Sequence, residues 1–182
     1  MSKHAVIVVD LQNDYLSTGK LPLAGIDAAL SNAARVVGAA RARGEPVIHV
    51  RHEFEQDDAP FFAPGSAGAQ IHPAVAPQEG EAVILKHRPN SFLGTDLKEQ
   101  LDAGGIEAVT IVGAMSHMYI DATARAAADL GYRVTVVADA CATRELEFRG
   151  QTVPAAQVHA AQMAALAFAY ATVVDTDAYL GA

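Results

Sequence analysis

GAMSHMYIDATARAAADLGY, residues 113–132, joins the end of an apolar run to a helical pattern. The run before it, residues 108–113, is rich in β-branched residues, as strands are. Ser116 is a candidate N-cap for the helix, which places Tyr119 in the first helical turn. Backbone N–H groups are unpaired in that turn, and the local potential favours an anion. The stretch therefore predicts a strand that leads directly into a helix at the base of an active site.

On both sides of this stretch, short Val- and Ile-rich runs alternate with longer Ala-rich helical segments. The runs are nearly continuous in apolar residues, which indicates strands buried on both faces of a parallel sheet. We therefore expect a single α/β domain, residues 1–182, with a three-layer, doubly wound, Rossmann-like sheet. The expected strands are 4–10, 46–51, 82–86, 108–113, 133–139 and 171–176, and the expected helices are 26–43, 95–103, 117–130 and 154–170.

Composition excludes several classes of function. The 182 residues are 51% hydrophobic and 19% charged, as in a compact globular domain. A formal charge of −8 argues against nucleic acid or an anionic membrane as a partner. The absence of a signal peptide, and a single cysteine, Cys141, favour a reducing cytoplasm. The smooth Ala-rich segment 154–170 predicts a homo-oligomer, a dimer or tetramer, and the irregular segment 53–80 predicts a lid or pocket wall.

Charged residues follow the ends of the expected strands. Asp10 ends the first strand, Arg51 and His52 end the second, and Lys86 ends the third. The carboxyl ends of parallel strands share one edge, where open α/β sheets bind ligands. Taken singly, Asp10 reads as an N-cap or turn residue and Lys86 as a solvated charge. An acid and a base on the same edge favour a functional pair.

Three blocks of sequence carry a family resemblance over essentially the whole chain. They are VIVVDLQNDYL (6–16), KHRPNSFLGTDL (86–97) and VGAMSHMYIDATARAAADLGYRVTVVADACATR (112–144). The chain resembles the isochorismatase-like cysteine hydrolases, a group that includes nicotinamidases, N-carbamoylsarcosine amidohydrolase and isochorismatase. The resemblance implies a six-stranded parallel sheet in the order 3-2-1-4-5-6 and a hydrolase of small amides, ureides or related carbonyl compounds.

The resemblance also implies roles for individual residues. Asp10 matches the family's general base, Lys86 its catalytic lysine, and Tyr119 stands where the nucleophilic cysteine is expected. The Ala114–Met115 bond matches a cis peptide, and the backbone N–H groups of Met115 and residue 119 match an oxyanion hole. A phenol is a poor replacement for a thiol because its pKa is about 10.

Four accounts of Tyr119 follow, in order of preference. The working enzyme is a cysteine hydrolase, and this chain carries a substitution at its nucleophile. Alternatively, the chain uses no thiol, as isochorismatases do when an aspartate handles protons in vinyl-ether cleavage. Third, it is a non-catalytic descendant that binds a small molecule or a partner. Last, Tyr119 itself acts as nucleophile or acid.

The remaining candidates concern substrate, metal and cofactor. Cys141 lies in a block that the resemblance marks as structural, so it is a poor rival nucleophile. The Asp-x-His metal pair of nicotinamidase-like members reads Arg51 and Glu53 here, and no phosphate-binding glycine motif is present, so we expect neither metal nor cofactor. The partner is then a small-molecule substrate. Residues expected to bind it or its oxyanion are Ala114, Met115, Ser116, His117, Arg51, His52 and Phe92.

Overall fold

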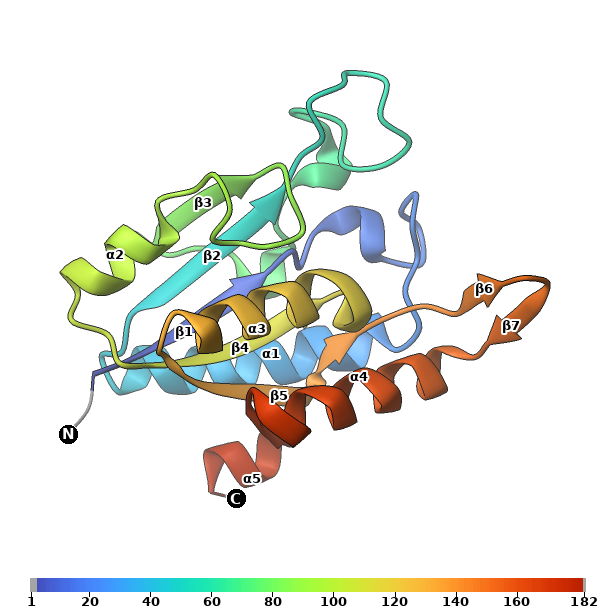
Figure 1. The fold of residues 1–182 in the computed structure, drawn as a ribbon. Helices are drawn as coiled ribbons and strands as arrows, with labels where there is room; N and C mark the ends of the chain where they lie inside the picture. Colours follow the sequence, from blue (N-terminus) through green and yellow to red (C-terminus); the bar gives the residue numbers. More distant parts are fainter. Residues whose placement is uncertain (1–2, 182) are drawn as a thin grey trace.

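Six parallel strands form one twisted sheet (Figure 1). The computed structural model describes residues 3–181, so residues 1, 2 and 182 of the expected domain lie outside the described residues. The order along the sheet is β3-β2-β1-β4-β5-β8, which confirms the expected order because β8 is the sixth strand of this sheet along the chain. The strands are β1 (His4–Val9), β2 (Val47–His52), β3 (Ala82–Lys86), β4 (Ala108–Ala114), β5 (Arg133–Ala142) and β8 (Thr172–Val174).

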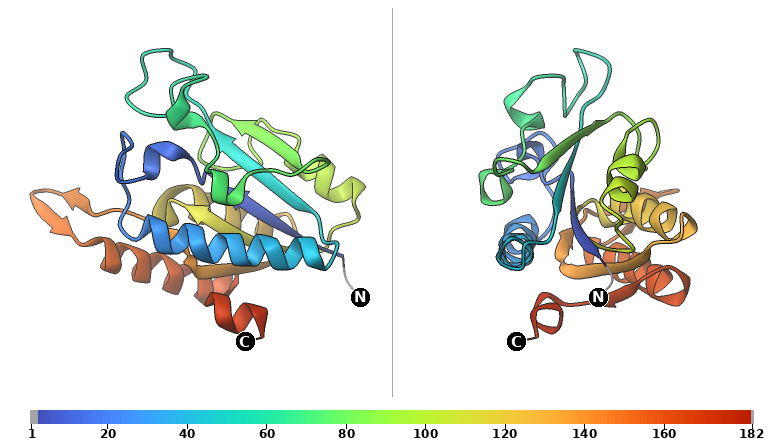
Figure 2. Two further views of the ribbon diagram at one scale, coloured as in Figure 1. Left: turned by 180° about the vertical axis from the view of Figure 1, so that it is seen from behind. Right: turned by 90° about the vertical axis from the view of Figure 1, so that its left-hand side faces the viewer.

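Helices cover both faces of the sheet, which gives three layers (Figure 2). The long helix α1 (Ile26–Ala42) and the short α5 (Thr176–Leu180) lie on one face. The other face carries α2 (Leu97–Ala103), α3 (Asp121–Asp129) and α4 (Ala155–Ala169). The four expected helices are confirmed with shifted ends. The sequence did not predict α5 or the antiparallel hairpin of β6 (Leu146–Phe148) and β7 (Gln151–Val153), which projects beyond the start of α4 (Figure 1).

The two central strands explain the continuous apolar runs. Every residue of β1 after His4 and of β4 after Ala108 is buried, because helices pack on both faces. At the end of β4, Gly113 lies so close to β1 that a Cβ atom would stand 1.9 Å from the carbonyl oxygen of Val9. Its φ of +137° also favours glycine. Glycine at this position lets the two strands approach closely beside Asp10.

The segment 53–80 forms a fixed wall above the carboxyl edge of the sheet. Buried residues just after β1 hold it: the Asp14 carboxylate accepts a hydrogen bond from the Phe62 amide at 2.7 Å, and the Gln12 side-chain amide donates to the carbonyl of Ala69 at 2.7 Å. Phe62 is fully buried. Of the two expectations, lid or pocket wall, the structure supports a pocket wall.

The outward face of α4 carries no charge. No residue of Ala155–Ala169 is Asp, Glu, Lys or Arg, and its exposed positions are alanines apart from Gln157 and Phe168. Phe168 is 92% exposed. None of the described helices is both long and apolar enough to cross a membrane.

Candidate active site

A buried ion pair lies where β1 and β3 end. Lys86 Nζ is 2.6 Å from Asp10 Oδ2, and both side chains are inaccessible to solvent. Asp10 has a positive φ of 52°, and its amide donates to the carbonyl of Val50 on the neighbouring strand. Strand β2 separates β1 from β3, so the long lysine side chain reaches across the end of β2. Sequence placed these two residues on one edge, and the structure brings them into contact.

Burial dominates the protonation of this pair. It raises the pKa of Asp10 to about 6, although the charge of Lys86 opposes the shift. Burial likewise lowers the pKa of Lys86, while Asp10 acts in the opposite direction. A carboxylate with a pKa close to neutral is well suited to accept and return a proton, because its two protonation states are both accessible.

The raised pKa of Asp10 makes folding stability depend on pH. A carboxyl group with a folded-state pKa of about 6 and an ordinary value of 3.8 stabilises the folded state below about pH 4 and loses this contribution as pH rises through 6. The shift corresponds to about 3 kcal/mol at 1.36 kcal/mol per unit. We therefore expect the stability advantage of the unmodified chain over Asp10→Asn to fall by up to that amount between pH 4 and pH 6, in urea denaturation.

A surface aspartate supplies the control for that titration. Asp102 has a lowered pKa because Lys98 hydrogen-bonds to its carboxylate, so its contribution is lost as pH falls, with the opposite sign. Asp102→Asn should therefore show no loss of advantage between pH 4 and pH 6. If the difference in free energy of unfolding between the unmodified chain and Asp10→Asn stays constant or grows from pH 4 to pH 6, the pKa of Asp10 is not raised.

Tyr119 lies against the ion pair. It belongs to a π-helical turn, Ser116–Ile120, that leads into α3, so it lies in the first turn as expected. Lys86 Nζ stands 3.9 Å from the centre of the Tyr119 ring, a favourable cation–π distance. Burial, together with the charge of Asp10, raises the pKa of Tyr119 to about 12. The phenol is therefore protonated at neutral pH and is a weak nucleophile.

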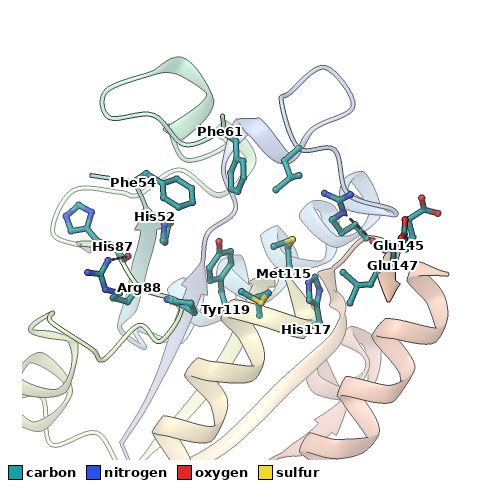
Figure 3. Close-up of a pocket in the computed structure, with 15 residues that line it drawn as sticks. His52, Phe54, Phe61, His87, Arg88, Met115, His117, Tyr119, Glu145 and Glu147 are labelled. Carbon is teal, nitrogen blue, oxygen red and sulfur yellow. Dashed lines mark hydrogen bonds between the residues drawn. The ribbon is translucent and has the colours of Figure 1, made fainter. Parts of the chain in front are cut away.

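A cavity of about 600 Å³ opens in front of Tyr119 (Figure 3). Phe54 and Phe61 of the pocket wall lie on one side of it, and the hydroxyl of Tyr119 points toward Phe61 (Figure 3). Asp10 and Lys86 do not line this cavity, whereas Tyr119 does. The phenol ring therefore stands between the ion pair and the cavity. The lining residues are Leu21, His52, Phe54, Phe61, His87, Arg88, Pro89, Met115, His117, Met118, Tyr119, Arg144, Glu145, Leu146 and Glu147.

The structure brings some of the expected binding residues to the cavity and not others. His52, Met115 and His117 line it. Arg51 does not; it pairs with Glu53 at 2.5 Å. Phe92 lies outside the cavity as well, stacked on Tyr132 with ring centres 6.2 Å apart. Arg51 does not reach this cavity although His52 does, because neighbouring side chains of a strand face opposite sides. The expected role of Arg51 and Phe92 in substrate binding stays a prediction.

The junction between β4 and the π-turn differs in one respect from the expectation. Ala114 is fully buried, and the Ala114–Met115 peptide bond is cis, as expected. Ser116, however, does not cap the helix: its hydroxyl donates to the carbonyl of Ala142 at 3.2 Å and lies 2.8 Å from Nδ1 of His159. The N-cap residue is Met115, because the π-turn begins one residue earlier than the expected helix.

Several residues of the site escaped sequence reasoning. Gln12 is buried and clamps His52 by its backbone: the side-chain oxygen accepts from the His52 amide, and the side-chain amide donates to the His52 carbonyl, both at 2.8 Å. Gln12 could have been suspected from the sequence because it belongs to a group of polar residues that directly follows the buried first strand. Glu145 and Glu147 reach the cavity from the β6–β7 region, which the sequence did not predict.

Cys141 is buried, and burial raises its pKa to about 12, so its thiol is unreactive. It does not line the cavity in front of Tyr119. Within residues 3–181, no three His, Cys, Asp or Glu side chains gather in a way that holds a metal ion.

Comparison with known proteins gives a consistent result. The Isochorismatase domain family matches residues 4–178. The isochorismatase family protein YddQ of Bacillus subtilis strain 168 is 48% identical over 97% of this chain and 98% of its own length. The crystal structure of a putative isochorismatase hydrolase from Oleispira antarctica superposes with a TM-score of 0.96, with 56% identity over 100% of this chain and 97% of that one. Maleamate amidohydrolase of Pseudomonas putida is 30% identical over 78% of this chain and 73% of its own.

Proposed function

The chain belongs to the isochorismatase-like hydrolase family, and from this premise we propose that its cavity binds a small amide, ureide or related carbonyl compound at an amidohydrolase-type site. In this proposal, position 119 is the place of the nucleophile. Because Tyr119 fills it with a phenol of high pKa, the chain in its present form binds such compounds but does not attack their carbonyl carbon through a thiolate.

One observation carries the proposal: the ion pair of Asp10 and Lys86 is intact while the Tyr119 ring separates it from the cavity. Two opposite charges without solvent exposure are expensive to keep for stability alone, since an apolar pair of similar size is often as good. By contrast, a carboxylate beside an ammonium group, as in Asp10 and Lys86, can accept a proton from a nucleophile at position 119. A relative named maleamate amidohydrolase supports C–N bond hydrolysis as the chemistry of such a site.

Binding without turnover is the first test. Calorimetry with a panel of primary amides and ureides should show binding to the unmodified chain at millimolar concentration, without release of ammonia. Tyr119→Ala should bind the same compounds more tightly, because removing the ring opens the cavity toward Asp10 and Lys86. Tyr170→Ala is the matched control: this ring lies over Arg125 and does not line the cavity, so its loss leaves binding unchanged. No binding by either the unmodified chain or Tyr119→Ala contradicts the proposal.

The pKa of Asp10 favours a second candidate function. A carboxyl group that titrates near pH 6 is able to donate a proton without any thiol, as vinyl-ether cleavage requires. This function requires the Tyr119 ring to turn aside so that Asp10 meets the substrate. The unmodified chain should then hydrolyse isochorismate, and Asp10→Asn should abolish the reaction. Turnover of isochorismate together with failure to bind amides would replace the first proposal by this one.

A further inference from the structure

His52 is held in place from two sides. Its backbone amide and carbonyl are both bonded to the buried side chain of Gln12, and its imidazole Nδ1 lies 3.1 Å from Nζ of Lys86. The ring packs edge to face with Phe54, at a centre-to-centre distance of 4.8 Å, and leans against Tyr119 at 5.3 Å. With only 2% of its surface exposed, His52 has little freedom to turn. Its orientation is therefore fixed before any ligand arrives.

The contact with Lys86 decides which nitrogen carries the imidazole proton. An ammonium group has donors only, so His52 Nδ1 must accept from it and cannot itself be protonated. The proton of a neutral ring then lies on Nε2. Burial, followed by the charge of Lys86, lowers the pKa of His52 to about 3, so the ring stays neutral over the whole physiological range.

The resulting Nε2–H group has no partner. It is buried, and no hydrogen-bond acceptor meets it within residues 3–181. A buried donor without an acceptor destabilises the fold, and such groups are rare in native proteins unless a bound molecule satisfies them. His52 and Tyr119 stand side by side on the cavity wall (Figure 3). The missing acceptor is therefore expected on a ligand in this cavity.

The charges around His52 indicate the kind of acceptor. The positive charges of Lys86 and Arg88 lie close enough to the His52 imidazole to lower its pKa, after the larger effect of burial. Arg88 also lines the cavity, as does a second arginine, Arg144. Glu145 and Glu147 come to the cavity from another part of the chain, after β5 and in β6. An oxygen that carries negative charge is therefore favoured beside His52 over a neutral one.

We infer that His52 Nε2–H is the specificity-determining donor of this cavity and binds a carboxylate oxygen of the ligand. The inference rests on the proposed function and narrows it: the substrates are small amides or ureides that also bear a carboxylate. Lys86 then serves two groups at once, the Asp10 carboxylate and the acceptor nitrogen of His52.

The tautomer is tested in the unmodified chain, without a ligand. The ¹⁵N NMR spectrum of histidine-labelled protein should show His52 neutral between pH 5 and pH 8, protonated at Nε2 and unprotonated at Nδ1. The resonances are assigned by their loss in His52→Gln. A proton on Nδ1, or titration of His52 within this range, overturns the inference whatever any ligand does.

The acceptor is tested with two probes that differ in one end, succinamate and butyramide. Succinamate has a carboxylate where butyramide has a methyl group, and both carry the same primary amide. Calorimetry is done in the Tyr119→Ala chain, where no ring covers the ion pair. Succinamate should bind at least about tenfold more tightly, which corresponds to about 1.4 kcal/mol. His52→Phe should bind the two probes equally. His52→Gln, which offers both an acceptor to Lys86 and a donor to the ligand, should restore most of the preference for succinamate.

The outcomes separate this inference from the proposed function. Equal binding of the two probes, or a preference that survives His52→Phe, overturns the role of His52 and leaves amide binding in place. Failure of both probes to bind contradicts the proposed function and this inference together.

Discussion

Tyr119→Cys should give the chain thiol-dependent hydrolysis of small amides that the unmodified chain lacks. Residue 119 is in the first turn of a helical segment, where backbone N–H groups and the helix dipole stabilise a thiolate. The smaller side chain also uncovers Lys86, which now lies 3.9 Å from the ring centre, and with it the carboxylate of Asp10. Nucleophile, base and cation would then share one opening.

The expected gain is large because two effects combine. Proton transfer to a well-placed base such as Asp10 is typically worth about 10²–10⁴ in rate. Backbone donors at Met115 and residue 119, if they meet the developing oxyanion, add about 10²–10³. Loss of the packed ring costs about 3–5 kcal/mol of stability if the site does not collapse, which lies within the stability of many domains.

Ammonia release from a panel of amides and ureides measures the gain. Iodoacetamide should abolish the activity of Tyr119→Cys, and the readout is clean because the other thiol, Cys141, is buried with a pKa of about 12. Tyr119→Ser is the matched control, since it opens the cavity equally but supplies no thiol. A folded Tyr119→Cys without alkylation-sensitive turnover on any compound would falsify the assignment of position 119. Turnover by the unmodified chain that this change abolishes makes Tyr119 itself catalytic.

Lys86→Met should destabilise the fold by about 3–5 kcal/mol, because it leaves the Asp10 carboxylate buried without a counter-charge. The loss should be greatest above pH 6, where Asp10 is ionised in the unmodified chain, and smaller at pH 5, where it is largely protonated. Equilibrium urea denaturation at pH 5 and pH 8 measures both values. The double change Asp10→Asn with Lys86→Met removes the unpaired charge and should recover part of the loss.

An exposed ion pair is the comparison for Lys86→Met. Lys98 and Asp102 are four residues apart within α2, and their side chains are 44% and 52% exposed. Solvent screens an exposed pair and weakens it, so Lys98→Met should cost much less stability than Lys86→Met. If Lys86→Met and Lys98→Met lower the free energy of unfolding equally, the buried ion pair contributes no more to stability than the exposed one.

The sequence predicted most of the fold because the signal is repeated along the chain. Each central strand is buried on both faces, so its sequence is an unbroken run of apolar residues, as in residues 5–9. The hairpin formed by β6 and β7 escaped because its strands are three residues long and largely exposed, so they carry no apolar pattern. Helix α5, with five residues, is too short for helical periodicity to be recognised.

For the candidate site, sequence predicted which strand ends meet but not which way side chains point. Asp10 and Lys86 could be paired because a parallel sheet brings their strand ends to one edge. His52 and Arg51 are neighbours in sequence, yet one lines the cavity and the other pairs with Glu53. The contact between Lys86 and His52 forms because the Lys86 side chain extends over the end of β2, and no local sequence pattern predicts such a contact.

The expected homo-oligomer stays a prediction. If two copies associate, we expect their contact to include the uncharged outward face of α4, on which Phe168 is exposed. Elsewhere the net charge of −8 opposes the approach of a second copy.

The anchoring of the segment 53–80 has a consequence for the rates at which ligands come and go. Since Gln12 and Asp14 already hold this wall, no loop must be ordered during association. Entry is then limited by diffusion and orientation, and compounds of one series should share similar association rate constants. Their affinities should therefore differ mainly through their dissociation rate constants, which depend on the contacts that each compound makes with the residues lining the cavity.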